Sequence, residues 1–110
     1  MSTTPKVLGQ SQPTSASLTD LYTVPAATSA TVSSIVICNT SGSTRAFRIS
    51  IAVAGAADNI KQYLYYDVSI ESGDTFIATI GATLAATDKI RVKTDSGNSL
   101  SFSAFGIEVA

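Results

Sequence analysis

The chain has 110 residues, of which 45% are hydrophobic and 14% are charged, and its formal net charge is −1. This length suits one domain, and the apolar content excludes a disordered chain. The basic residues are scattered, which argues against binding to nucleic acid or to a membrane surface. No apolar run approaches the roughly 20 residues of a membrane span. The N-terminus also lacks the charged and apolar regions of a signal peptide, so we expect a soluble protein made in a cytoplasm.

The first 17 residues are rich in Ser, Thr, Gln and Pro, with Val7 and Leu8 as their only large apolar pair. Such a segment cannot fold by itself. We expect either a mobile arm or a strand that docks onto the body or onto a neighbour. The sequence therefore predicts an extended N-terminal arm over residues 1–17 and a single β-sandwich domain over residues 18–110.

The sequence of residues 18–110 predicts a succession of short strands separated by turn residues. The clearest turn is 39–43, a run of Asn, Thr, Ser and Gly that suits a change of chain direction. The stretch after it alternates apolar and polar residues from Phe47 to Val53, which indicates one buried and one solvated face. A loop is expected at 54–59, where β-branched residues are absent. The predicted strands are 18–24, 31–38, 45–53, 62–70, 75–80, 89–94 and 99–109.

The strand 62–70 also alternates, and it carries three of the four tyrosines of the chain. If Leu64 and Tyr66 face the core, Tyr63 and Tyr65 stand on the surface two residues apart. Exposed aromatic residues mark partner interfaces or sugar-stacking platforms. The alternative is a strand covered on both sides, with all three tyrosines in the core, because periodicity cannot separate the two cases.

Four kinds of local feature are predicted in the second half of the chain. Asp74 and Asp88 are expected to accept hydrogen bonds from local backbone amides in turns. Gly81 is expected to end a strand, and 95–98 to form a hairpin turn into the last strand. That last strand changes phase, which indicates a β-bulge near 104–106. Its predicted inward residues are Leu100, Phe102 and Ala104, followed by Phe105, Ile107 and Val109.

About eight short strands with frequent turns and no helical periodicity predict an all-β protein. We expect an antiparallel β-sandwich with jelly-roll-like or immunoglobulin-like connectivity.

The residue types argue against catalysis. The chain has no His and one Cys, which excludes Ser/His/Asp and Cys/His sites and any zinc site. Cys38 is expected to be a small buried apolar residue. The acidic group Asp67, Glu71 and Asp74 could bind calcium or act as a glycosidase pair, but it lacks calcium-loop spacing and also suits a solvated strand end with its turn. We expect no catalytic residue, no metal and no cofactor.

Several stretches resemble small virion structural proteins of tailed bacteriophages. They are 21–26, 32–39, 47–48, 65–67, 75–81, 84–88 and 100–106. The resemblance covers nearly the whole chain from Val7 onward and rests on turn and strand residues, without a catalytic signature. It implies a non-enzymatic β-sandwich made in the bacterial host cytoplasm and assembled onto the virion in many copies.

Within that group the resemblance favours a capsid decoration or cement protein, which would bind the outer shell as a homo-oligomer and bridge subunits of the major capsid protein. The alternative is a tail- or fibre-associated module that binds carbohydrate. The resemblance carries over no functional residue. The candidate partner interface therefore rests on our own inference, and its residues are Pro5, Lys6, Val7, Leu8, Tyr63 and Tyr65.

Overall fold

The computed structural model describes residues 2–110, and Met1, the first residue of the predicted arm, lies outside them. Within residues 2–110 the chain forms eight strands and two short 3₁₀ helices. The elements are β1 (Thr3–Ser11), β2 (Thr19–Thr23), β3 (Ser29–Asn39), β4 (Arg45–Ala52), η1 (Val53–Gly55), η2 (Ile60–Gln62), β5 (Tyr63–Ile70), β6 (Thr75–Leu84), β7 (Lys89–Thr94) and β8 (Leu100–Val109).

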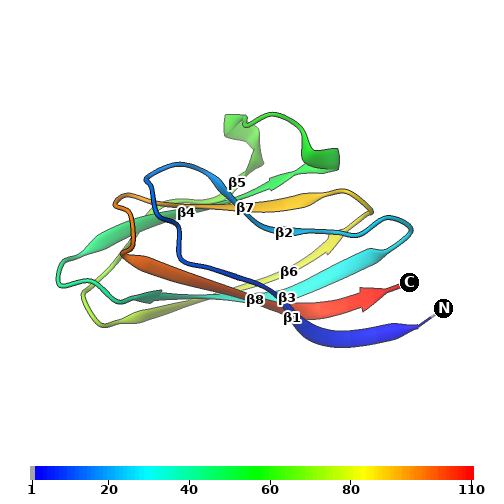
Figure 1. The fold of residues 1–110 in the computed structure, drawn as a ribbon, viewed down its shortest axis with the longest axis horizontal. Coiled ribbons are helices and arrows are strands. Elements are labelled where there is room, and N and C mark those ends of the chain that lie inside the picture. Colours follow the sequence, from blue (N-terminus) through cyan, green and yellow to red (C-terminus); the bar gives the residue numbers. More distant parts are fainter. Residues whose placement is uncertain (1) are drawn as a thin grey trace.

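The strands form two antiparallel sheets that pack face to face. One sheet has the order β1-β8-β3-β6 and the other the order β2-β7-β4-β5. Figure 1 shows them as a lower and an upper layer, with both chain ends at the same end of the lower layer. The predicted all-β sandwich is confirmed.

The strand pairs are nested along the chain. The first strand pairs with the last, and the same rule continues inward as β2–β7, β3–β6 and β4–β5. This is the arrangement of one long hairpin wrapped into two sheets, with the loop between β4 and β5 at its tip. An eight-stranded wrap of this kind is a jelly roll, which decides between the two connectivities that the sequence left open.

Most turns in this fold pass from one sheet to the other. The turn 39–43 joins β3 and β4, which do not pair. The side chain of Asn39 builds this crossing: its amide donates to the carbonyls of Ser43 and Ile70 at 2.8 and 2.9 Å, and its oxygen accepts from the amide of Ser41 at 2.9 Å. The hairpin predicted at 95–98 is wrong for the same reason, since β7 and β8 lie in different sheets.

Two strand predictions in the second half of the chain are wrong. Gly81 does not end a strand, because its positive φ of 63° accommodates a register shift and β6 continues to Leu84. The last strand keeps its phase, and Phe105 and Ile107 line an external groove. A register shift does occur opposite Ala104–Gly106, but the extra residue lies on the neighbouring strands, at Leu8 of β1 and Ser33 of β3.

The core lies between the sheets and centres on Phe47. The ring of Phe47 packs against Phe76 and Phe102 at centroid distances of 5.3 and 6.4 Å. Ile35 and Ile37 of β3 are fully buried beside them, each a contribution of about 1.5–3 kcal/mol to folding. Cys38 is half-buried, contrary to the expectation of a buried thiol, because it alternates with Ile37 and faces the outside of β3.

Candidate functional site: the exposed surfaces of the two sheets

Of the acidic residues that the sequence grouped together, Asp67 is engaged by a basic side chain. Asp67 receives two hydrogen bonds from Arg48, at 2.7 Å from Nε and 3.1 Å from Nη2. The Arg48 guanidinium lowers the pKa of the Asp67 carboxyl, and the carboxylate raises the pKa of Arg48. Within residues 2–110 no group of three or more His, Cys, Asp or Glu side chains is placed to hold a metal. In the same residues no helix has the length and apolarity needed to cross a membrane.

Three of the predicted interface residues lie exposed on β1, at one edge of the first sheet. Pro5, Lys6 and Val7 are exposed, whereas Leu8 is 9% exposed and belongs to the core. The segment predicted as an arm thus contains a strand that pairs with β8 of its own chain, which is the docked form among the alternatives that the sequence left open.

A shallow groove of about 480 Å³ runs across the outer face of this sheet, from β1 over β8 to β3. Pro5 and Lys6 form one wall, and Phe105 and Ile107 lie on its floor. Thr31 and Ser33 form the other wall. Phe105 and Ile107 contribute here because β8 keeps its phase, so the sequence prediction that placed both inward could not find this surface.

Two contacts hold β1 against the body at this groove. Gly106 leaves room for Leu8, since a Cβ at Gly106 would lie 2.0 Å from the carbonyl oxygen of Thr31 and 3.0 Å from Leu8 Cδ1. Lys6 donates to Glu108 of β8 at 3.3 Å. The hydrogen bond from Tyr22, followed by that from Lys6, lowers the pKa of Glu108. β1 is therefore fixed by packing and by charge.

The predicted facing of β5 is wrong in its first half. Leu64 and Tyr66 are 47% and 49% exposed, and Tyr65 packs against the core, with its ring 6.1 Å from that of Phe47. The strand changes phase at Asp67, which has a positive φ of 52° and leaves Val68 facing inward. Two register shifts against β4 accompany the change. A positive φ at Asp is not visible in an alternating pattern, so the change of phase could not be predicted from the sequence.

Tyr63 and Tyr66 instead form a cluster with Arg48, in which Tyr66 is exposed and the other two side chains are half-buried. The guanidinium carbon of Arg48 lies 3.8 Å from the ring centroid of Tyr66 and 5.5 Å from that of Tyr63. The two rings meet edge to face with centroids 5.0 Å apart. Of the two tyrosines that the sequence singled out, the structure places Tyr63 on this surface and Tyr65 in the interior.

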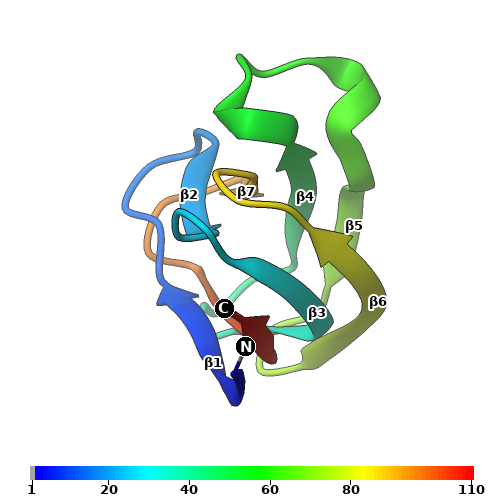
Figure 2. The same ribbon diagram turned by 90° about the vertical axis from the view of Figure 1, so that its right-hand side faces the viewer.

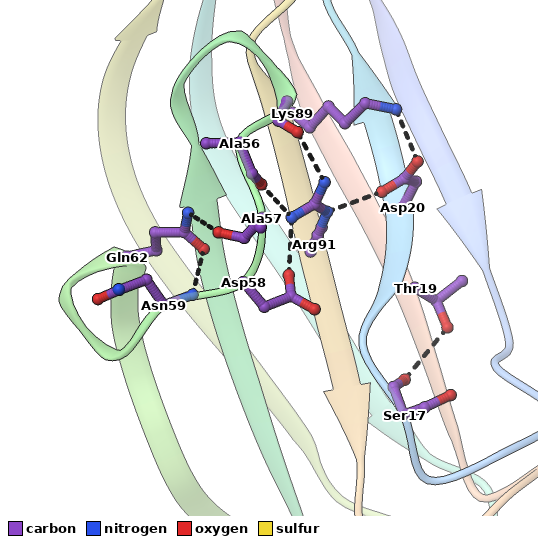
Figure 3. A network of polar contacts seen from close by, with 11 residues as sticks. Ser17, Thr19, Asp20, Ala56, Ala57, Asp58, Asn59, Gln62, Lys89 and Arg91 are labelled. Carbon is purple, nitrogen blue, oxygen red and sulfur yellow. Dashed lines mark hydrogen bonds and ion pairs between the residues drawn. The ribbon is translucent and has the colours of Figure 1, made fainter.

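A second polar cluster, centred on Arg91 of β7, was not foreseen. Figure 3 shows its guanidinium between Asp20 of β2 and the loop that follows η1. It donates to Asp20 at 3.1 Å and to Asp58 at 2.7 Å, and Lys89 donates to Asp20 at 2.8 Å. The Lys89 ammonium, followed by Arg91, lowers the pKa of Asp20. The alternation of Lys89 and Arg91 along β7 was the available signal, but it did not indicate their partners.

The same cluster fixes the loop 53–62 at the tip of the wrapped hairpin. Arg91 donates to the carbonyls of Ala56 and Gly55 at 2.7 and 3.3 Å. Asn59 and Gln62 form a capping box around η2, also visible in Figure 3. The loop nevertheless presents Val53 and Ile60 to the outside, at 69% and 71% exposure.

No protein-family model matches the sequence, and neither does any curated protein. Solved structures share the fold. A chain in the T13 IBDV viral particle has a TM-score of 0.58 and 11% identity, and the match covers 97% of this chain and 29% of that chain. A chain of infectious bursal disease virus Gx strain has a TM-score of 0.54 and 15% identity, covering 97% and 32%.

A chain with the CBM22-1 and GH10 modules of the Clostridium thermocellum xylanase 10B has a lower TM-score, 0.47, at 15% identity, covering 96% of this chain and 24% of that chain. The present chain spans about a third of the length of the viral chains that it matches. At these identities the similarity to the viral chains establishes a common fold. The narrower assignment to tailed bacteriophages stays a prediction.

Proposed function

We propose that this chain is a non-enzymatic structural protein of a virus particle. The observation that carries the proposal is the match of 97% of the chain to a jelly roll in a viral particle. Jelly rolls recur in viral capsid domains, although lectins and cupins share them. The chain also carries no His and one Cys, which removes the common catalytic constellations.

The narrower proposal is a capsid decoration or cement protein of a tailed bacteriophage, located in the virion and made in the host cytoplasm. Its partner is the major capsid protein or another virion protein. Pro5, Lys6 and Val7, together with the groove floor at Phe105 and Ile107, form the surface for that contact. Many weak contacts per particle sum to firm retention through avidity. Residues 1–17 then add to the assembly by pairing with β8 of a neighbour in place of β8 of the same chain.

The test is made on particles from cells that carry the viral genome encoding this chain. Mass spectrometry of gradient-purified particles is expected to find the chain in many copies per particle, and immunogold labelling to place it on the outer shell. A chain that stays in the soluble fraction contradicts the structural role. Labelling of the tail contradicts the decoration role and leaves the structural role in place.

A tail- or fibre-associated module that binds carbohydrate is the second candidate. The cluster of Tyr63, Tyr66 and Arg48 favours it, because sugars stack on exposed aromatic rings and Tyr66 is 49% exposed. Retention on a glycan array is expected to be lost on Tyr66→Ala. Tyr65→Ala is unsuitable as a probe, because Tyr65 packs against the core. Absence of glycan binding by the native protein removes this candidate.

A further inference from the structure

The two sheets have four edge strands within the described residues: β1, β6, β2 and β5. An edge strand presents unpaired backbone amides and carbonyls, which another strand can bind, and proteins block such edges with charges, prolines, bulges or short strands. The edges of this protein differ in how well they are blocked.

Three of the edges carry such devices. β1 contains Pro5 and Lys6, and it closes against β2, where a Cβ at Gly9 would lie 2.1 Å from the carbonyl oxygen of Leu21. β2 is only five residues long and carries Asp20, which is engaged by Lys89 and Arg91. β5 is distorted by two register shifts and carries Asp67.

β6 has none of these devices in its straight part, Thr75–Ile80. This segment contains no charged residue and no proline, and the interruption by Gly81 comes only after it. Its outward residues Thr75, Ile77 and Thr79 are exposed, and Ile77 is 63% exposed at the centre of the row. Within residues 2–110, β6 pairs with β3 alone.

Apolar residues also lie on the side of the sandwich next to this edge. Figure 2 shows β6 and β5 along the same side of the molecule. Leu64 of β5 and Ile80 of β6 line a narrow apolar slot between the sheets, and Leu64 is 47% exposed to solvent. The free edge therefore combines unpaired backbone groups with exposed apolar side chains.

We propose that β6 is a self-pairing edge, at which Thr75–Ile80 of two copies of this chain join antiparallel across a two-fold axis at Ile77. A free sheet edge binds an extended strand, because the spacing of its backbone amides and carbonyls matches that of another strand. A second β6 suits the charge pattern, since no ionised side chain lies within the paired segment. Pairing of β1, β2 or β5 with itself would instead bring Lys6, Asp20 or Asp67 of both copies to one short edge.

The charge nearest to the segment is compatible with this pairing. With Ile77 on the axis, Asp74 of each copy lies opposite Ile80 of the other. The two Asp74 side chains then stand about 20 Å apart, at about 3.3 Å per residue, which is beyond the screening length in physiological salt. An axis at Ile77 also covers the most exposed apolar residue of the edge.

The test measures the solution mass of the full chain by light scattering behind size exclusion, at concentrations up to about 0.1 mM. The native protein is expected to be a dimer. Ile77→Lys places two ammonium groups opposite each other and is expected to give a monomer. Ile60→Lys is the matched control, because Ile60 is as exposed but lies in the loop before β5, and it is expected to remain a dimer.

Three results overturn the proposal: a native monomer, a native trimer, or an Ile77→Lys protein that remains a dimer. A dimer that Ile60→Lys also dissociates places the interface at the loop and overturns it as well. The inference does not rest on the proposed function, because a dimer can form whether or not the chain joins a particle.

A cross-linking measurement keeps the test decisive if Ile77→Lys does not fold, as judged by circular dichroism. In a Cys38→Ser background, which removes the only native thiol, Ile77→Cys is expected to form an intermolecular disulfide under mild oxidation, because a residue on the axis faces its own copy. Ile60→Cys in the same background is expected to form far less. Equal cross-linking of the two variants overturns the proposal.

Discussion

The phenol of Tyr22 on β2 donates a 2.5 Å hydrogen bond to the carboxylate of Glu108 on β8, so this bond joins the two sheets across 86 positions of sequence. Tyr22 is 7% exposed, and its pKa is raised by burial and then by Glu108. Lys6 of β1 donates to the same carboxylate at 3.3 Å. Three strands therefore meet at one acidic group near the chain ends.

Loss of this phenol is expected to destabilise the fold. Hydrogen bonds to charged groups contribute about 1.5–3 kcal/mol, and Tyr22→Phe is expected to lower the free energy of unfolding by about that amount in urea denaturation. Tyr66→Phe, at a half-exposed ring, is the control and is expected to change it by less than about 0.5 kcal/mol. Equal effects of the two variants contradict a structural role for the Tyr22–Glu108 bond.

Stability is expected to fall in acid. The pKa values of Asp20, Asp67 and Glu108 lie below their ordinary range, because each carboxylate accepts hydrogen bonds, chiefly from Lys89, Arg48 and Tyr22, respectively. A lowered folded-state pKa means that the unfolded chain binds protons more readily. The stabilisation is therefore complete above the unfolded pKa of about 4 and is lost as the pH falls through the folded values.

Thermal melts from about pH 7 to pH 2 measure this effect. The Tm is expected to be nearly constant above about pH 5 and to drop below it. Glu108→Gln removes one of the three titrating groups, so its Tm is expected to depend less steeply on pH in the acid range. A native Tm that rises on acidification is the contrary result.

Asp88 is expected to matter more for stability than Asp74, although both were predicted from their positions in turns. Both predictions are confirmed: Asp88 accepts from the amide of Ala85 at 2.9 Å, and Asp74 from that of Thr75 at 2.8 Å. Asp88 is 8% exposed and also accepts from the amide of Ala54 at 2.8 Å, so it ties two separate turns together.

Asp88→Ala leaves two backbone amides without their acceptor and is expected to cost about 2–4 kcal/mol in the free energy of unfolding. Asp74→Ala removes one exposed local bond and is expected to cost less than about 1 kcal/mol. Chemical denaturation of both variants makes the comparison. Similar losses for the two would show that the contact with Ala54 adds nothing.

A methyl group at Gly106 is expected to displace β1. In Gly106→Ala the new Cβ meets the backbone oxygen of Thr31, which cannot move without breaking the β3–β8 ladder, and it also meets Leu8 Cδ1 of β1 at 3.0 Å. Overpacking of this kind costs about 1–3 kcal/mol or more. Hydrogen exchange is expected to show lost protection in β1. Gly42→Ala is the matched control, with no atom within 4 Å of its Cβ and no positive φ, and it is expected to leave the protection of β1 unchanged.

The sequence predicted element type well and the connections between elements poorly. Strands such as β4 and β7 followed from alternation alone, because each buries one face against the opposite sheet. Alternation carries no information about which sheet a strand joins. The turns at 39–43 and 95–98 therefore looked like ordinary reversals, although both cross between sheets.

The candidate surface was predicted only in part, and the missing part has a related cause. A register shift changes which residues face outward, and its position depends on the partner strand. Phe105 and Ile107 were assigned to the core because the extra residue was placed on β8, whereas it lies on β1 and β3. Tyr63 and Tyr65 were both predicted to face outward, because the sequence carries no signal for the positive φ at Asp67 that changes the facing of this strand. The exposure of Pro5, Lys6 and Val7 followed from the polar composition around them.

The backbones of Ser2 and Ala110 are joined by two hydrogen bonds of 2.9 Å, from each amide to the other carbonyl. Both ends of the described chain therefore leave the sandwich at one point, on β1 and β8. A loop of a host protein whose two ends are separated by about the width of a strand pair, roughly 5 Å, can accept the whole sandwich as an inserted cassette. Peptides fused to the two ends would emerge side by side from the same place on the sandwich, so both could be displayed on one side of the molecule.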